Sequence, residues 1–159
     1  MKQEEVVANI LKEKGLTIAV AESCTGGLIA NRLTDVEGAS KSFIAGFVTY
    51  SNESKSNFLN VPYELILKKG AVSHEVAYKM AEGVRLAAGV DIGVSSTGIA
   101  GPSGGTEEKP VGTVYIAISG KDKTFVKKLS LKGSRVKIKK QTSDEVLNMI
   151  IEYIEGRLT

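Results

Sequence analysis

The segment 16–21 is an almost unbroken apolar run, and it limits the possible folds of this chain more than any other feature. A strand that faces solvent on one side alternates apolar and polar residues, whereas a continuous apolar run is typical of a strand buried on both faces. Helices must then cover both faces of the sheet. The run therefore predicts an α/β fold, a three-layer α/β/α sandwich with a mixed, mostly parallel sheet.

Hydrophobic periodicity predicts the other elements. Apolar residues recur at helical spacing in the segments 3–14, 25–34, 74–88 and 135–157, and shorter helices are expected at 52–59 and 63–68. Strand patterns occupy the segments 16–21, 43–50, 91–97, 111–119 and 123–131. The tripeptide Gly120-Lys121-Asp122 has the composition of a hairpin turn, so the last two strands should be antiparallel.

Length and composition are those of one globular domain. The chain has 159 residues, of which 42% are hydrophobic and 25% are charged, and no repeat or linker divides residues 1–159. No apolar run is long enough to span a membrane, and the N-terminal segment is an acidic amphipathic helix unlike a targeting signal. These features favour a cytoplasmic protein.

Cysteine and histidine chemistry is largely excluded. Cys24 is the only cysteine and His74 the only histidine, so an internal disulfide and a two-histidine metal site cannot be built. His74 follows a predicted Ser73 N-cap in an exposed helical turn, where a surface role is expected. Cys24 is interpreted as a small residue behind a helix start. A catalytic triad based on either residue is therefore disfavoured.

Small and polar residues gather where strands end. The first strand runs into Glu22-Ser23-Cys24-Thr25-Gly26-Gly27, the strand 43–50 into Ser51-Asn52, and the strand 91–97 into a glycine-rich loop. Strand ends that lead into helices are where open α/β sheets bind ligands, and loops poor in side chains let a ligand approach backbone N–H groups. The pattern predicts a pocket for a phosphate or an oxyanion.

Lysine is the remaining candidate for a general base. Lys55 is expected in the first turns of a helix, where the helix dipole and partial burial lower the pKa of a lysine. A neutral lysine can activate a serine hydroxyl. The serines near it in the sequence are Ser40, Ser42, Ser51 and Ser54. Tyr50, at the end of the strand 43–50, could share a hydrogen bond with both the hydroxyl and the amine. The alternative is that Lys55 is a solvent-facing helix residue.

Charge is unevenly distributed along the chain. The net charge of +3 is too small to indicate nucleic acid, but residues 127–140 hold seven Lys or Arg residues and no acid. Most of these side chains are expected on a solvated strand edge and helix start. Arg135 lies at a strand-to-helix junction, where a guanidinium is suited to a phosphate.

Four motifs carry a resemblance to a known family. The segments AESCTGG, GFVTYSNESK, GAVSHE and STGIAGPSGGTEEKPVGTVY occur in this order and closely resemble the CinA C-terminal-domain family, whose characterised members are nicotinamide mononucleotide deamidases. The resemblance covers essentially the whole chain. In some relatives this domain follows a large N-terminal domain, and we expect this chain to be the stand-alone form.

The resemblance implies hydrolysis of the carboxamide of nicotinamide mononucleotide to nicotinate mononucleotide and ammonia, in pyridine nucleotide salvage, with no metal or organic cofactor. It implies a catalytic set of Ser40 as nucleophile, Tyr50 and Lys55, with Ala39 where a serine is usual. Ser23 is the next candidate for the nucleophile. The substrate-binding positions that it implies are Ser23, Thr25, Gly26, Gly27, Thr97, Gly98, Gly101 and Arg135.

Two other functions stay open. A nucleotide-binding regulatory module would keep the glycine-rich loops but would have no use for a Ser40, Tyr50 and Lys55 set. A nucleic-acid-binding protein would need a basic face with aromatics, and only 6% of residues are aromatic, with no tryptophan. We expect a small-molecule nucleotide as partner, no membrane and no nucleic acid, and a homodimer or larger homo-oligomer.

Overall fold

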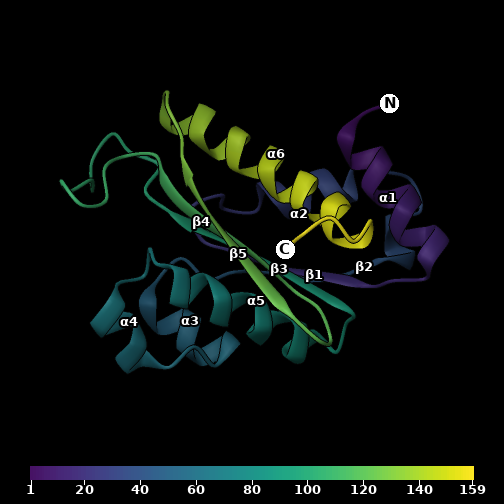
Figure 1. Ribbon diagram of the computed structural model, residues 1–159, viewed down its shortest axis with the longest axis horizontal. Coiled ribbons are helices and arrows are strands. Elements are labelled where there is room, and N and C mark those ends of the chain that lie inside the picture. The colour runs from purple at the N-terminus through teal and green to yellow at the C-terminus, as the bar shows by residue number, and fades with distance from the viewer.

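The computed structural model describes residues 1–159, which form three layers around one sheet (Figure 1). In chain order the elements are α1 Gln3–Lys14, β1 Ile18–Glu22, α2 Leu28–Thr34, the 3-10 turn η1 Ala39–Lys41, β2 Phe43–Val48, α3 Asn52–Leu59, α4 Tyr63–Lys69, α5 His74–Ala88, β3 Ile92–Gly98, β4 Thr113–Ser119, β5 Thr124–Ser130 and α6 Arg135–Ile154. Helices α1, α2 and α6 lie on one side of the sheet, and α3, α4 and α5 lie on the other. The predicted three-layer fold is confirmed.

The sheet has the strand order β2-β1-β3-β4-β5. β1 pairs in parallel with β2 and with β3, whereas β4 is antiparallel to both of its neighbours. The sheet is therefore mixed, with β4 alone running against the other strands, and the predicted hairpin between the last two strands is confirmed. Because β1, β2 and β3 are parallel, their carboxyl ends lie next to one another at the same end of the sheet.

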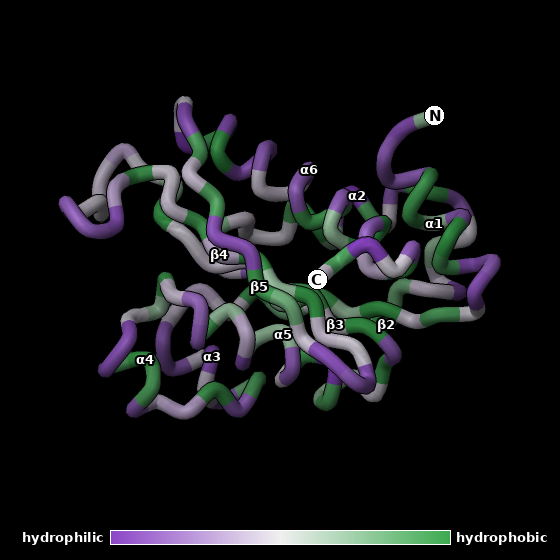
Figure 2. Tube along the Cα trace, in the orientation of Figure 1, coloured by the Kyte–Doolittle hydropathy of each residue, from purple (hydrophilic) through white to green (hydrophobic).

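Two hydrophobic cores hold the layers together. A cluster of 18 buried residues, including Val20 and Leu147, lies between the sheet and the layer of α1, α2 and α6. A second cluster of 9, including Met80, lies under α3, α4 and α5. All five residues of β1 are buried; the apolar run predicts this for residues 18–21, whereas the fifth residue is Glu22. Figure 2 shows hydrophobic green along the sheet and purple on the outer turns of the helices, the pattern expected when each helix buries only one face.

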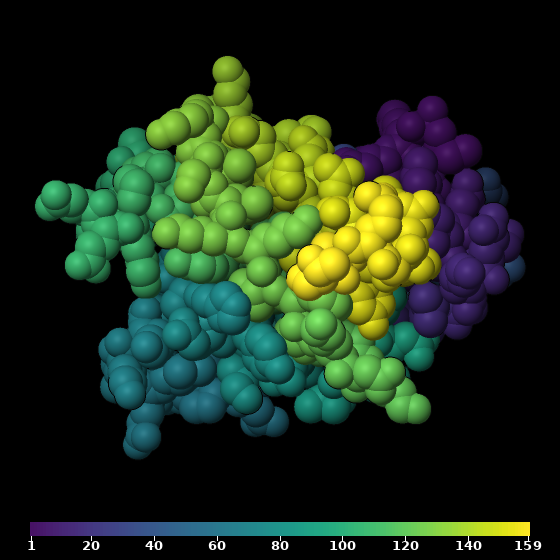
Figure 3. Space-filling view, viewed as in Figure 1, coloured from purple at the N-terminus to yellow at the C-terminus, as the bar shows by residue number.

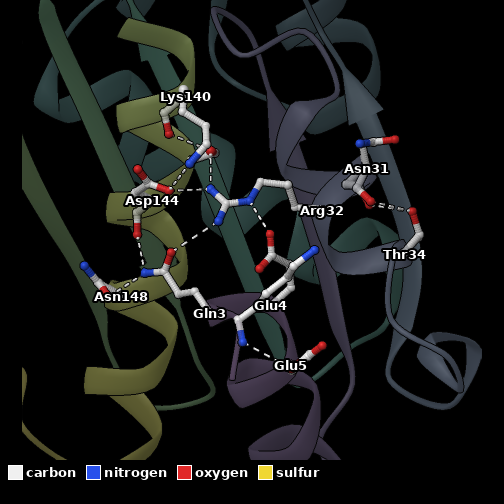
Figure 4. A network of polar contacts seen from close by, with 12 residues as sticks. Gln3, Glu4, Glu5, Asn31, Arg32, Thr34, Lys140, Asp144 and Asn148 are labelled. Carbon is white, nitrogen blue, oxygen red and sulfur yellow. Dashed lines mark hydrogen bonds and ion pairs between the residues drawn. The ribbon is translucent and has the colours of Figure 1, made fainter. Parts of the chain in front are cut away.

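One buried guanidinium ties the three helices of the first layer together (Figure 4). Arg32 of α2 donates to Glu4 Oε1 of α1 at 2.8 Å and to Asp144 Oδ1 of α6 at 2.6 Å, and it also reaches Ser143 Oγ at 2.6 Å. The hydrogen bond from Arg32 holds the pKa of Glu4 below its ordinary value. Burial works in the opposite direction at Asp144, but hydrogen bonds from Arg32 and Lys140 leave its pKa lowered as well.

Several element ends differ from the prediction. α2 begins at Leu28 and not at residue 25, because Gly26 and Gly27 take left-handed φ angles of 61° and 108° that a right-handed helix cannot contain. The strand predicted at 43–50 ends at Val48, the helix predicted to residue 157 ends at Ile154, and no periodicity predicts η1. No helix combines the length and the apolar composition that crossing a membrane requires.

Candidate active site

The predicted loops meet at the carboxyl ends of the parallel strands. β1 leads into the turn that begins at Ser23, and β2 leads through Thr49 and Tyr50 into α3. Ser51 caps α3, its Oγ accepting from the backbone N–H of Ser54 at 3.1 Å. This cap fixes where the helix begins, so that Lys55 lies in the first turn and points back toward the end of β1.

Lys55 is the centre of the site. Its side chain is among the largest fully buried ones, with 1% of the residue exposed. The ammonium Nζ donates to the Thr49 carbonyl at 2.7 Å and to Ser23 Oγ at 3.0 Å, with a longer contact of 3.4 Å to the Tyr50 carbonyl. All three partners are neutral oxygens. The burial expected for Lys55 is therefore confirmed and the solvent-facing alternative is wrong, and Lys55 is a buried amine without an acidic counter-ion.

Burial lowers the pKa of Lys55 to about 8. An ammonium in a low-dielectric setting costs free energy that no carboxylate offsets here, so the neutral amine is favoured. A lysine of ordinary pKa carries almost no neutral amine at pH 7, whereas one with a pKa near 8 carries a useful fraction. The geometry thus provides a general base within hydrogen-bond distance of a serine hydroxyl, which is the arrangement of a Ser-Lys hydrolase.

Ser23 is the hydroxyl that the structure brings to Lys55. The residue is 9% exposed, and its backbone N–H donates to the Ser96 carbonyl of β3 at 3.0 Å, which anchors it across the sheet. The next two backbone N–H groups, those of Cys24 and Thr25, donate to no protein acceptor. In other hydrolases, free backbone N–H groups close to the nucleophile donate to the oxyanion. The N–H groups of Cys24 and Thr25 have a similar position relative to Ser23.

Glu22 holds this turn in shape. Its carboxylate is completely buried and accepts from Thr25 Oγ1 at 2.5 Å and from the backbone N–H groups of Gly27, Ile29 and Ala30 at 3.2, 2.9 and 2.9 Å. The carboxylate therefore caps α2, whose first N–H groups have no intrahelical acceptor. Because it is saturated by these donors, Glu22 makes no contact with the ammonium of Lys55.

Ser40, the nucleophile that the resemblance implies, does not lie beside Lys55 within one chain. It belongs to η1, which precedes β2, whereas Lys55 follows β2. The intervening strand has 6 residues. A strand of that length spans about 17 Å, which no serine or lysine side chain can bridge. Ser40 and Lys55 are close in sequence, but they lie beyond opposite ends of β2.

Tyr50 and Arg135 form the rim of the site that contains Lys55 and Ser23. The Arg135 guanidinium donates to Tyr50 Oη at 2.8 Å and to the Gly101 carbonyl at 2.8 Å, so it joins the end of β2, the 99–112 loop and the start of α6. Tyr50 is 60% exposed, and its hydroxyl faces Arg135. The expectation that this hydroxyl bridges the serine and the lysine is wrong, since only the Tyr50 carbonyl contacts Lys55. The glycine-rich 99–112 loop protrudes beside this rim (Figure 3).

Several residues predicted to bind substrate make contacts within the protein framework. The Thr25 hydroxyl is shared between Glu22 and Ser96 Oγ, the latter at 2.7 Å, and the Thr97 hydroxyl donates to the Ala71 carbonyl at 2.8 Å. Both threonines are buried, so neither hydroxyl is free for a ligand in this arrangement. Gly98 packs so closely on β4 that a Cβ would lie 2.6 Å from Val114 Cγ2.

Two further groups belong to the site without any sequence signal. Thr49 supplies the shortest contact of Lys55, and its own buried Oγ1 has no hydrogen-bond partner. Lys139 of α6 lies over the β1 turn, since a Cβ on Gly26 would be 3.4 Å from its Nζ. The site therefore carries two cations at its mouth, Arg135 and Lys139, in addition to the buried amine.

Cys24 is buried and His74 is exposed, the placement that the sequence predicts for His74. Burial raises the pKa of Cys24 to about 12, so its thiol stays protonated and unreactive. His74 is exposed in the first turn of α5. No three His, Cys, Asp or Glu side chains lie together as metal ligands. No surface pocket reaches Ser23 or Lys55. The most enclosed pocket lies between α1, α2 and η1, at the amino ends of β1 and β2.

An open α/β sheet with a buried Ser-Lys pair at the carboxyl ends of its parallel strands defines the class of protein to which this chain belongs. Residues 1–154 match the model of the CinA C-terminal domain, and the chain belongs to the CinA family. This result confirms the resemblance carried by the four sequence motifs.

The chain is similar to a "Putative competence-damage inducible protein" of Caldanaerobacter subterraneus subsp. tengcongensis, at 51% identity over 98% of this chain and 38% of that protein. A "CinA-like protein" of Kosmotoga olearia is 52% identical over 92% of this chain and 36% of its own length. The chain thus spans less than two fifths of these curated relatives.

Solved structures match over nearly their whole length. A competence/damage inducible protein of Agrobacterium tumefaciens has a TM-score of 0.89 at 38% identity and covers 94% of this chain and 93% of its own. A CinA superfamily protein of Klebsiella pneumoniae has a TM-score of 0.93 at 30% identity, covering 98% and 99%. These likenesses agree with the fold described above.

Proposed function

We propose that this chain is an amidohydrolase that cleaves the carboxamide of nicotinamide mononucleotide and releases ammonia and nicotinate mononucleotide. The observation that carries the proposal is the 3.0 Å contact between Ser23 Oγ and the buried Nζ of Lys55, whose pKa burial lowers to about 8. The motif resemblance supplies the substrate. The rim cations Arg135 and Lys139 fit its phosphate, since both would lie at the mouth of the site.

The first half of the proposed reaction forms an acyl-enzyme. Neutral Lys55 takes the proton of Ser23 as Oγ attacks the carboxamide carbon, and the carbonyl oxygen becomes an oxyanion. The N–H groups of Cys24 and Thr25 donate to that oxyanion, and each such donor contributes about 3 kcal/mol to transition-state stabilisation in other hydrolases. The C–N bond then breaks, and protonated Lys55 returns its proton to the departing nitrogen, which leaves as ammonia.

The second half regenerates the enzyme. Neutral Lys55 takes a proton from water, whose oxygen attacks the acyl carbon, and the C–O bond to Ser23 breaks with transfer of that proton to Ser23 Oγ. The products are the free hydroxyl and the carboxylic acid, which ionises to the carboxylate by losing its proton to solvent. Every proton moves between Ser23, Lys55, water and the leaving nitrogen, so this mechanism uses no metal ion.

Ammonia release by the purified protein incubated with nicotinamide mononucleotide tests the activity, and two variants test the residues. We expect Ser23→Ala to lower turnover by at least about a thousandfold, whereas Ser40→Ala should retain most of it. The two substitutions are chemically identical and both remove one hydroxyl, so each serves as the control for the other. Turnover that survives Ser23→Ala but not Ser40→Ala would reject the assignment.

A regulatory module is the second candidate, because the same loops could bind a nucleotide without cleaving it. Calorimetric binding of nicotinamide mononucleotide with no ammonia release from wild type would favour that reading. An enzyme should instead release ammonia from wild type while Ser23→Ala binds the substrate intact.

A further inference from the structure

The most enclosed pocket of the molecule lies far from the candidate active site. It is bounded by α1, α2, η1 and the first residues of β1 and β2, and its volume is about 110 Å³. Ser23 and Lys55 lie beyond the carboxyl ends of the same two strands. β2 has 6 residues and spans about 17 Å, so a ligand that fits this volume cannot reach both places. The pocket is therefore separate from the site described above.

The floor of the pocket is apolar. Leu11 of α1, Ile18 of β1 and Leu33 of α2 line it, and all three are buried members of the first hydrophobic core. Val36 and Phe43 add further apolar surface. Cavities lined by such residues stay dry, and one of about 150 Å³ binds benzene. By volume, this pocket therefore fits an apolar group of about four carbon atoms.

Ser42 brings a buried hydroxyl without a partner to this pocket. Its backbone is fixed, since its carbonyl accepts from the Ile18 N–H at 2.8 Å and its N–H donates to the Ala39 carbonyl at 3.0 Å. The residue is 8% exposed, and its Oγ makes no hydrogen bond within the protein. Buried hydroxyls usually have a partner, because an unpaired one loses its hydrogen bonds to water. Since Ser42 lines the pocket, its hydroxyl is available to a ligand there.

The rest of the lining is polar and carries a net positive charge. Lys12 of α1 and Lys41 of η1 are exposed, and neither forms an ion pair. Glu37 is the only acid in the lining, and it pairs with neither lysine. The backbone N–H groups of Glu37 and Gly38 donate to no protein acceptor, in a turn where Gly38 has a left-handed φ of 84°. Successive free N–H groups in such a turn favour an anion.

We propose that this pocket binds a small monocarboxylate with a compact apolar body of about four carbon atoms. The carbon atoms pack on the apolar floor. The carboxylate accepts from Ser42 Oγ and faces the ammonium groups of Lys12 and Lys41. This inference goes beyond the proposed function, because no residue of the Ser23–Lys55 site takes part in it.

The two halves of the pocket select this class of ligand together. Water satisfies the polar part of the lining but not the apolar floor, and inorganic phosphate leaves the floor unfilled for the same reason. A hydrocarbon without a polar group leaves the Ser42 hydroxyl without an acceptor. A carboxylate on a four-carbon body meets both requirements and, with a pKa of about 4.3, is ionised at neutral pH.

Titration of the 15N-labelled protein with 3-methylbutanoate, followed by NMR, tests the site without any use of activity. We expect saturable shifts of the backbone amide signals of residues 36–42, with a Kd on the order of 1 mM because the ligand has few atoms. Acetate lacks the apolar body and 3-methylbutanamide lacks the charge, so each should bind at least about tenfold more weakly. If either compound binds as tightly as the acid, the proposed ligand class is wrong. Saturable shifts confined to the Ser23 turn, or none up to about 20 mM, would overturn the proposed site.

Three variants test the contacts. Ser42→Ala should raise the Kd about three- to tenfold, since a hydrogen bond to a charged group is lost. The double variant Lys12→Gln/Lys41→Gln should raise it by a similar factor, and its exposed positions do not endanger folding. Lys14→Gln is the matched control, an exposed lysine of α1 outside the pocket, and should leave the Kd unchanged. An unchanged Kd in both Ser42→Ala and the double variant would reject the proposal. None of these outcomes depends on ammonia release, so the proposed function and this site fail independently.

Discussion

The buried amine of Lys55 makes a quantitative prediction about pH. With its pKa lowered from 10.5 to about 8, about one tenth of the molecules carry neutral Lys55 at pH 7, against about one in three thousand for an unshifted lysine. Burial therefore raises the concentration of competent base about three hundredfold at neutral pH. If neutral Lys55 activates Ser23, kcat/KM should rise about tenfold per pH unit below pH 8 and level off near pH 9.

The assay is ammonia release at substrate concentrations well below KM, between pH 7 and pH 10. The second ionisation of the substrate phosphate lies near pH 6, outside this range. Lys55→Arg keeps the positive charge but cannot lose a proton, so it should lower kcat/KM by about a hundred- to ten-thousandfold and abolish the inflection. Lys132→Arg, an exposed lysine near α6, is the matched control and should leave the profile unchanged.

An inflection near pH 10 in wild type would mean that Lys55 is not desolvated in solution. An inflection near pH 8 that persists in Lys55→Arg would assign the titrating base to another group. Either result would refute the assignment of Lys55 as general base, whereas loss of the inflection in Lys55→Arg alone would support it.

Four other results are expected. Arg135→Ala should raise KM about ten- to hundredfold with a smaller fall in kcat, because a charge-assisted contact to the remote phosphate contributes about 1.5–3 kcal/mol, and Lys132→Ala gives the baseline in steady-state kinetics. Arg32→Met should lower stability by about 2–4 kcal/mol and Tm by roughly 5–15 °C in calorimetry, since it leaves the carboxylate of Glu4 without its ion-pair partner and Asp144 with Lys140 alone; a change under about 1 kcal/mol would contradict this. The pKa of Glu4 is lowered by folding, so the stabilisation that it provides should be present above its unfolded pKa and be lost as pH falls through the folded value, with urea titrations of wild type and Arg32→Met converging in acid. Turnover should survive EDTA, and loss of activity that a divalent ion restores would contradict the metal-free mechanism.

Parallel topology explains why Lys55 contacts Ser23 and not Ser40, the nucleophile that the resemblance implies. Ser40 and Lys55 are close along the chain, but β2 lies between them. They therefore lie beyond opposite ends of this strand. Ser23 is farther along the chain but follows β1, the parallel neighbour of β2. The carboxyl ends of adjacent parallel strands coincide in space, so the predicted strands and their directions already contained the signal for Ser23.

Other features of the site could not be predicted from the sequence. A buried hydroxyl can hydrogen-bond either to a ligand or to the protein. The sequence does not predict that the Thr25 hydroxyl donates to Glu22, or that the Thr97 hydroxyl donates to the Ala71 carbonyl. Lys139 reaches Gly26 only because α6 crosses over the β1 turn, a matter of helix packing. The hairpin of β4 and β5 and the burial of residues 18–21, by contrast, follow from local patterns with which the whole fold is consistent.

The separation of Glu22 from Lys55 is what makes the serine-lysine pair chemically useful. A buried carboxylate and a buried ammonium in neighbouring loops would ordinarily pair, and the pair would hold the lysine protonated. Here four donors from the start of α2 and from Thr25 occupy the carboxylate, so its charge is neutralised locally by the helix that it caps. Lys55 is left with neutral oxygens alone, and desolvation then favours the amine. The same buried acid thus shapes the Ser23 turn and, by being saturated, leaves Lys55 with neutral partners only, as the proposed role of general base requires.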